Sequence, residues 1–175
     1  MKPIAILFGT LAALAAAAAL ITRADNSRPD PKTPAGSAQA AAAKEPAPVV
    51  DWLTDFDAAR QKARSEGKTL LLDFTGSDWC GWCIKLEQEI FTTPEFAGFA
   101  VKHLVLVKVD FPRGKPQSAA EQRQNEQLAA RFQVQGFPTL VLLKADGEPL
   151  GTLGYMRGGP EPFLKELAAV IKAGS

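Results

Sequence analysis

The segment DWCGWCIKL, residues 78–86, contains the only two cysteines of this chain, Cys80 and Cys83. A structural disulfide framework needs several cysteines, and a tetrahedral zinc site needs four ligands, more than this pair and the single histidine, His103, can supply. We therefore expect no metal site. An inert disulfide staple is the structural alternative, but so short a loop constrains the unfolded chain little. The spacing favours a redox-active pair.

The residues around the pair predict a buried strand followed by a helix. The apolar run KTLLLDF, residues 68–74, ends in TGS, as a buried strand does where it enters a loop. From Cys80 onward, apolar residues recur with helical spacing at positions 83, 86, 90 and 91. At a helix start, free N–H groups and the helix dipole stabilise a thiolate, and they lower a cysteine pKa from about 8.5 to about 3.5–7.5. Cys80 is therefore the expected nucleophile.

Three separated segments resemble the thioredoxin superfamily in their order and spacing. The strand carrying Asp73, together with the cysteine motif, matches the active-site segment of that family, and VQGFPTL, residues 134–140, matches its cis-proline loop. The strand pair around ADGE, residues 145–148, and the closing Gly158-Gly159 also fit. The resemblance covers nearly everything from residue 50 to residue 175. It implies an α/β fold with a mixed four- to five-stranded sheet flanked by helices on both faces.

Within the superfamily, one class is most similar. The DWCGWC-x-KL segment and the following EQEIF, residues 87–91, resemble exported bacterial thioredoxin-like thiol-disulfide oxidoreductases and the thioredoxin-like ends of membrane electron transporters. This resemblance implies thiol-disulfide exchange at the cysteine pair.

The resemblance also assigns roles to residues beside the cysteines. The family's acid matching Asp73 lies buried behind the second cysteine and relays protons; the alternative is a carboxylate that faces solvent at a strand end. The proline matching Pro138 is cis, which would bring the backbone of Phe137 beside the sulfurs, where an extended substrate segment can pair with it. The expected catalytic residues are Cys80, Cys83 and Asp73, and the expected substrate-binding residues are Trp79, Gly81, Trp82, Phe137 and Pro138, with Trp82 exposed.

Two positions depart from thioredoxin. Trp82 stands where thioredoxin has proline. Leu106 stands where thioredoxin has a strand lysine near the buried acid, with Lys108 displaced along the strand. We therefore expect proton transfer at the second cysteine to differ from that of thioredoxin. Asp78 is expected to be a surface charge that tunes the nucleophile weakly.

The remaining patterns predict alternating helices and strands. Only Val49-Val50 is available as a first strand, and Thr54 is the expected N-cap of the first helix. The Asp146-Gly147 pair predicts a hairpin. The polar, mixed-charge stretch 117–127 indicates a solvated helix face. The expected helices span 55–66, 119–132 and 160–172, besides those starting near 80 and 94, and the expected strands span 68–74, 103–110, 139–144 and 149–155.

The amino-terminal residues predict export. Lys2 precedes an apolar, alanine-rich run over residues 4–21, and Thr22-Arg23-Ala24 offers a small-residue cleavage site. The run is longer than the 7–15 residues or so of a signal-peptide core and close to the roughly 18 that indicate a spanning helix, so residues 1–24 are expected to be a signal peptide or a membrane anchor. Residues 25–48 predict a flexible Pro/Ala-rich linker, and residues 49–175 a thioredoxin-like domain. The expected location is periplasmic or otherwise exported, with inner-membrane anchoring as the alternative.

These features together predict a reductase of disulfides in exported proteins. Gly81-Trp82 contains no cation of the kind that stabilises the thiolate in oxidising relatives. The net charge of +1 argues against nucleic acid as a partner. We expect a monomer without a cofactor other than the Cys80–Cys83 disulfide, with disulfide-containing exported proteins and a membrane electron transporter as partners. The alternative is a client-binding or cytochrome-maturation module in which redox activity is secondary.

Overall fold

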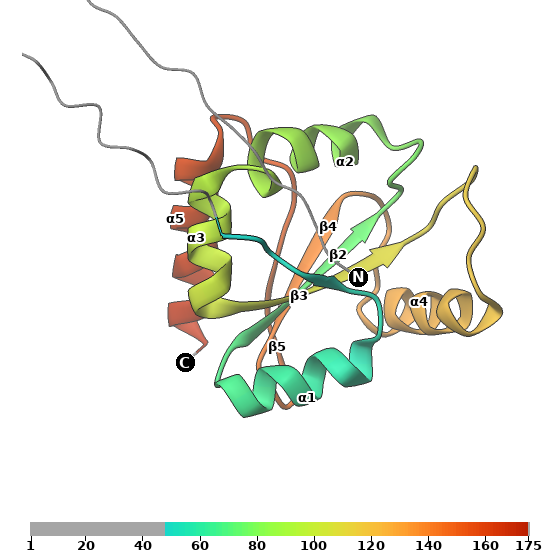
Figure 1. Cartoon of the computed structure of the whole chain (residues 1–175), viewed down its shortest axis with the longest axis horizontal. Helices are drawn as coiled ribbons and strands as arrows, with labels where there is room; N and C mark the ends of the chain where they lie inside the picture. The colour runs from blue at the N-terminus through green and yellow to red at the C-terminus, as the bar shows by residue number, and fades with distance from the viewer. Residues whose placement is uncertain (1–47, 175) are drawn as a thin grey trace, which may run out of the picture. The chain divides into compact units, whose positions relative to one another are not determined.

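The computed structural model describes residues 48–174, so the leader predicted over residues 1–24 and nearly all of the linker predicted over 25–48 lie outside the described residues. The described domain is built on one five-stranded sheet in the order β1-β3-β2-β4-β5 (Figure 1). Strands β1, β3 and β2 are parallel, whereas β4 pairs antiparallel with β2 and β5 antiparallel with β4. The mixed sheet is as predicted. Its strands are β1 (Trp52–Leu53), β2 (Thr69–Thr75), β3 (Leu104–Asp110), β4 (Thr139–Leu143) and β5 (Pro149–Leu153).

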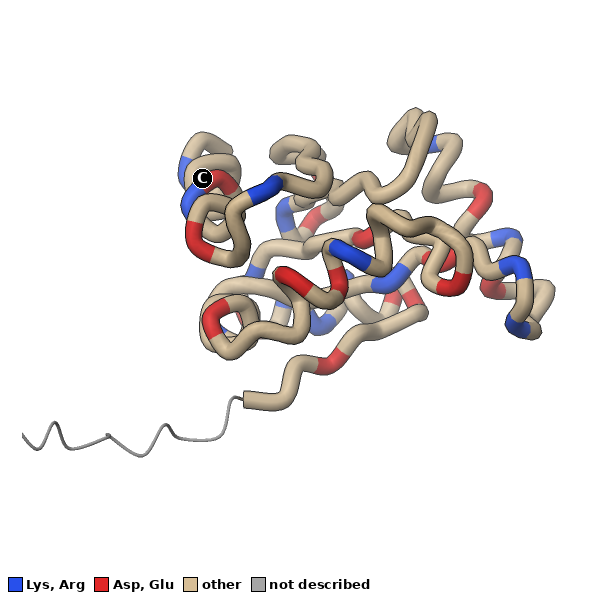
Figure 2. Tube along the Cα trace, turned by 90° about the horizontal axis from the view of Figure 1, so that it is seen from above, with Lys and Arg blue, Asp and Glu red and all other residues tan. Residues whose placement is uncertain are grey.

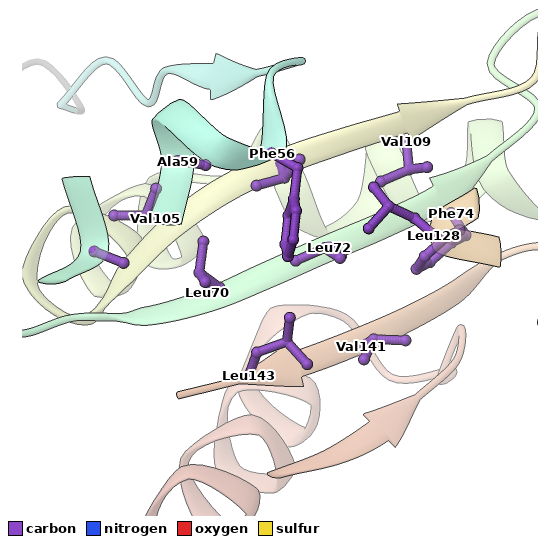
Figure 3. Close-up of a cluster of buried hydrophobic side chains, with 12 residues drawn as sticks. Phe56, Ala59, Leu70, Leu72, Phe74, Val105, Val109, Leu128, Val141 and Leu143 are labelled. Carbon is purple, nitrogen blue, oxygen red and sulfur yellow. The ribbon is translucent and has the colours of Figure 1, made fainter. Parts of the chain in front are cut away.

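Helices cover both faces of the sheet, because the side chains of its central strands are apolar on both sides. Leu70, Leu72 and Phe74 of β2 point into a core beneath α1 (Phe56–Glu66) and α4 (Ala119–Arg131) (Figure 3). Leu71 points to the opposite face, into a second core. That core is covered by α2 (Gly81–Leu86), the π-helical turn η1 (Glu87–Phe91), α3 (Pro94–His103) and α5 (Pro160–Ala173). Lys, Arg, Asp and Glu are intermixed over the domain (Figure 2).

The first strand lies later in the chain than predicted. Residues 49 and 50 are not in a strand, and β1 consists of Trp52 and Leu53, which pair with Leu106 and Val107 of β3. Tertiary packing decided otherwise, since the Trp52 ring lies 4.9 Å from the Phe91 ring and so anchors this segment over the second core.

The cap of α1 also differs by one residue. Asp55, not Thr54, is the N-cap, and its Oδ1 atom accepts a hydrogen bond from the Ala58 N–H at 2.9 Å. The predicted hairpin around Gly147 is confirmed, and this glycine has a φ of 96°, which other residues rarely adopt. The other element bounds agree with the predictions to within two residues. Among residues 48–174, none of the helices combines the length and apolar character needed to cross a membrane.

Candidate active site

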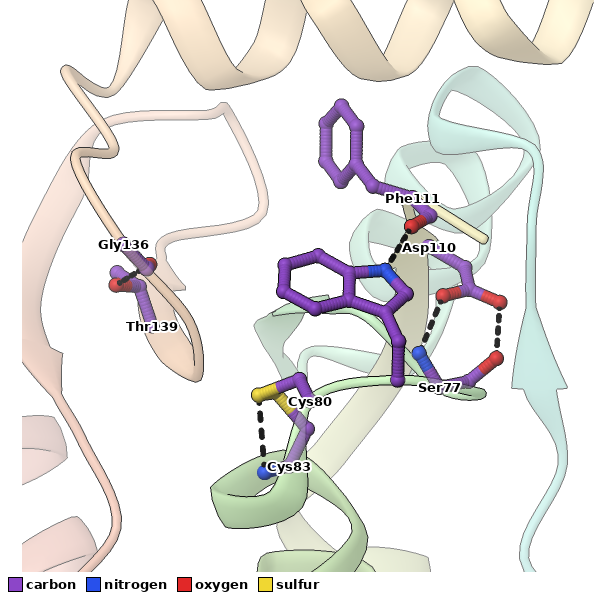
Figure 4. The surroundings of a disulfide bond; sticks show 8 residues. Ser77, Cys80, Cys83, Asp110, Phe111, Gly136 and Thr139 are labelled. Atoms are coloured by element: carbon purple, nitrogen blue, oxygen red, sulfur yellow. Dashed lines mark hydrogen bonds between the residues drawn. A yellow bond between two sulfur atoms is a disulfide. The ribbon is translucent and has the colours of Figure 1, made fainter. Parts of the chain in front are cut away.

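Cys80 and Cys83 form a disulfide at the start of α2 (Figure 4). The backbone of Cys80 is extended, so the helix begins at Gly81 and Cys80 is its N-cap. The Cys80 Sγ atom accepts a hydrogen bond from the Cys83 N–H at 3.2 Å. Both cysteines are buried among their neighbours. The prediction that the first cysteine begins the helix is confirmed, and the N–H that caps the sulfur is a donor of the kind that stabilises a thiolate.

Trp79 directly precedes Cys80, and a hydrogen bond and a ring contact hold its side chain in place. Its indole N–H donates to the Phe111 carbonyl at 2.7 Å (Figure 4). Its ring meets the Phe137 ring edge-on at 5.9 Å. A Cβ added at Gly76 would lie only 2.5 Å from the indole. Glycine is therefore required at position 76 by this packing, a requirement that the sequence analysis missed. The ring remains 37% exposed and is available to a substrate.

The cis-proline loop lies against the same indole. The Phe137–Pro138 peptide bond is cis, as the resemblance implied. The Phe137 ring stacks on Phe111 at 5.1 Å. The Thr139 hydroxyl donates to the Gly136 carbonyl at 2.8 Å (Figure 4). The rings of Trp79, Phe137 and Phe111 thus join three segments that are far apart in the sequence.

Gly81 and Trp82 lie between the two cysteines in the first turn of α2, and both are exposed. Trp82 is 51% exposed, as predicted, and its ring lies 5.4 Å from the ring of Tyr155. Tyr155 donates its hydroxyl to Glu89, a bond that lowers the pKa of Glu89 and raises that of Tyr155. A Cβ added at Gly81 would meet no heavy atom within 4 Å, so the surface there is open. Tyr155 was missed by the sequence analysis because no local pattern links the end of β5 to the cysteines.

Asp73 is buried in the sheet, only 2% exposed. It points to the same face as Leu71, the face covered by α2, and its Oδ1 atom has no hydrogen-bond partner among residues 48–174. The pKa of Asp73 is raised to about 7: burial raises it most, the charge of Lys108 lowers it, and the charges of Glu87 and Asp110 raise it. The alternative of a solvent-facing carboxylate is wrong.

Lys108 is not displaced from the acid as we expected. Parallel pairing of β2 and β3 puts Lys108 directly in register with Asp73. The Lys108 Nζ atom lies 3.0 Å from Glu87 Oε2, so the buried carboxyl has a cation and a second carboxylate as electrostatic neighbours. The prediction placed Lys108 too far from Asp73 because it compared only the position of the lysine along the strand with that in thioredoxin. The register between β2 and β3 decides which side chains are neighbours.

A pocket of about 170 Å³ lies next to the second cysteine. The Glu87–Lys108 ion pair and Cys83 are among the residues that line it. Water and protons therefore have access to Cys83 through this pocket. The other lining residues are Thr75, Ser77, Ile84 and Gln88.

The polar stretch of α4 is not simply a solvated face. Asn125 is 1% exposed, and its side-chain N–H donates to the backbone carbonyl of Asp110 at 2.9 Å. The Asp110 carboxylate in turn accepts the Ser77 N–H at 2.9 Å and the Ser77 hydroxyl at 2.6 Å (Figure 4). Asn125 thus helps to hold the end of β3 beside the active-site loop, which polarity and helical periodicity alone did not reveal.

Comparisons with known proteins agree with this geometry. The family described as thioredoxin-like domain matches residues 56–171. The chain belongs to this family. The thioredoxin-like chain is 38% identical to disulfide bond reductase DsbH of Chlamydia pneumoniae over 114 residues, which are 65% of this chain and 69% of that protein. The solved structure of a DsbH oxidoreductase matches with a TM-score of 0.68 and 35% identity, covering 72% of this chain and 88% of that chain.

A longer relative matches over a part of its length. The thiol:disulfide interchange protein DsbD of Vibrio cholerae serotype O1 is 29% identical over 118 residues, which are 66% of this chain but 18% of that protein. The comparisons confirm the thioredoxin-like fold and the predicted membership of the thioredoxin superfamily.

Proposed function

We propose that this protein is a thiol-disulfide oxidoreductase that reduces disulfides in exported proteins. The observation that carries the proposal is the Cys80–Cys83 disulfide at the start of α2, beside two exposed indoles and the cis-proline loop. The similarity to disulfide bond reductase DsbH supports the direction of the reaction. The pair Gly81-Trp82 between the cysteines supports it too, because it has no cation to stabilise the reduced form.

The reaction is a two-step exchange that starts from the reduced pair. The Cys80 thiolate attacks one sulfur of the substrate disulfide, forms a mixed disulfide and releases the other substrate sulfur, which takes up a proton. Cys83 then loses its proton and attacks the Cys80 sulfur. The Cys80–Cys83 disulfide is restored, the second substrate thiol leaves, and two electrons have passed to the substrate. This chemistry uses the cysteine pair as its only redox group.

Asp73 is the proposed proton acceptor for Cys83. A carboxyl whose pKa is about 7 exchanges protons readily near neutral pH, which suits a general base better than an ordinary carboxylate does. The pocket that Cys83 shares with Glu87 and Lys108 offers a route between this site and water. Trp79, Trp82 and the Phe137–Pro138 loop are the proposed contacts for the polypeptide around the substrate disulfide.

The proposed electron donor is a membrane electron transporter, which would pass electrons to this protein on the outer side of the inner membrane. The match to DsbD, named a thiol:disulfide interchange protein, supports a partner of this class. The proposed location is the periplasm, and residues 1–24 are proposed to direct export, either as a cleaved signal peptide or as an anchor. The intact mass of the native chain tests this: a start near residue 25 supports cleavage, and a retained Met1 in the membrane fraction supports anchoring.

Active-site substitutions test the proposed function. With insulin as the disulfide substrate and dithiothreitol as the reductant, Cys80→Ser should abolish catalysed reduction. Cys83→Ser, reduced and then freed of dithiothreitol before the substrate is added, should instead accumulate mixed disulfides with the substrate, because the resolving thiol is missing. Lys102→Gln, on the exposed end of α3, is the matched control and should behave as wild type. Trapping by Cys80→Ser rather than Cys83→Ser would contradict the assigned roles, and binding of clients without turnover would favour the client-holding module.

A further inference from the structure

The loop that follows β3 is fixed against the active-site segment. The carboxylate of Asp78 accepts the Arg113 N–H at 3.0 Å and the Gly114 N–H at 2.6 Å, and these bonds hold the pKa of Asp78 below its usual range. Asp78 was expected to be a simple surface charge. It instead clamps the backbone of a segment 35 residues later in the chain.

Arg113 is thereby placed on the indole next to the nucleophile. Its Cζ atom lies 3.7 Å from the centre of the Trp79 ring, and Trp79 directly precedes Cys80. The guanidinium is exposed, and no carboxylate among residues 48–174 lies within 4 Å of it. Stacking on the indole holds the side chain in place without using its N–H groups.

Lys115 adds a second cation on the same loop. It is exposed, and its Nζ atom makes one long contact, 3.4 Å to the Ser77 hydroxyl. The acids nearest to these two cations are engaged elsewhere, since Asp78 binds backbone N–H groups and Asp110 binds Ser77. Asp78 and Asp110 keep their charges, but their oxygens already accept these hydrogen bonds, so the exposed N–H donors of Arg113 and Lys115 are left for a substrate.

We propose that Arg113 and Lys115 form a recognition site for a carboxylate side chain beside the disulfide of the substrate, so that the enzyme prefers disulfides flanked by acidic residues. The inference rests on the proposed function and names its substrate class. A guanidinium presents a planar fork of N–H donors that matches a carboxylate, and here the fork is already oriented by Trp79. Charge complementarity also raises the rate of encounter, an effect that salt weakens.

Three matched disulfide peptides test the preference. They share one sequence except for the two residues flanking the disulfide, which are Glu, Gln or Lys. Single-turnover reduction by the reduced enzyme is measured at an ionic strength of about 0.01 M and about 1 M, where the Debye length is about 30 Å and about 3 Å. The ratio of the rate constants for the Glu and Gln peptides is the readout, because an altered Cys80 thiolate changes both rates equally.

For the wild type at low salt, the Glu peptide should react about fivefold faster than the Gln peptide, as expected for one close charge pair in water. The Lys peptide should react more slowly than both. High salt, or the double substitution Arg113→Gln with Lys115→Gln, should bring the ratio close to one. Arg113→Lys should retain part of the preference because it keeps the charge. Lys102→Gln, at the opposite end of β3, should leave the ratio unchanged.

Two results would overturn the inference: a ratio near one in the wild type at low salt, or a ratio that the double substitution leaves unchanged. Far-ultraviolet circular dichroism and thermal unfolding check that each variant is folded. Reduction of the Gln peptide tests the proposed function independently of the acidic preference. If the wild type reduces all three peptides equally, only the acidic preference is wrong, whereas failure to reduce any of them would reject the reductase itself.

Discussion

Replacing Asp73 by Asn should stabilise the oxidised protein, and more so as the pH rises. The carboxyl is buried, its Oδ1 atom has no partner among the described residues, and its pKa is about 7. Between pH 3.8 and pH 7 the unfolded chain has released this proton while the folded chain still holds it. The folded state thus binds more protons, and the stability of the wild type falls as pH rises through this range. An Asn side chain does not titrate and avoids this loss.

The size of the effect follows from the two pKa values. The interval from 3.8 to about 7 is about three pH units, and at about 1.4 kcal/mol for each unit the full loss is about 4 kcal/mol. About 2.5 kcal/mol of this loss falls between pH 5 and pH 8. The free energy of unfolding of Asp73→Asn minus that of the wild type should rise by this amount over the same interval.

Urea unfolding of the oxidised proteins at pH 5, 6, 7 and 8 measures the difference. The other titratable groups are common to both proteins, so their contributions cancel. A difference between Asp73→Asn and the wild type that stays constant from pH 5 to pH 8 would refute the argument that burial raises the pKa of Asp73.

Three further substitutions probe the surroundings of the site. Gly76→Ala should cost about 1–3 kcal/mol of stability and shift the emission of Trp79, because the new Cβ overlaps the indole; unchanged emission and stability would contradict this packing. Lys108→Met should raise the pKa of Asp73 above its wild-type value, since an opposing charge is removed, and carboxyl NMR titration should show the midpoint moving to higher pH, with a downward shift as the contrary result. Asn125→Leu should cost about 1–3 kcal/mol in urea unfolding, because it takes one donor from the partly buried Asp110 carbonyl at the end of β3, and a neutral effect would mean that this bond is dispensable.

The features that the sequence determined are those with a local physical origin. The apolar run before the cysteines and the helical spacing after Cys80 predict β2 and α2, because a strand buried on both faces is apolar throughout and a helix buried on one face is apolar every 3.6 residues. The hairpin at Gly147 follows in the same way from turn geometry. The helix that begins at the cysteine pair and the turn between the last two strands therefore follow from short stretches of sequence alone.

Only the tertiary structure decides which residues from distant segments become neighbours. Lys108 acts on Asp73 because parallel strands pair in one register, and a sequence comparison with thioredoxin does not reveal that register. Asp78 holds the loop of Arg113, and Asn125 holds the end of β3, through hydrogen bonds across 35 and 15 residues of chain. A polar residue has the same local pattern whether it meets water or a buried backbone group. Only the packing of other elements around it determines which of the two it meets.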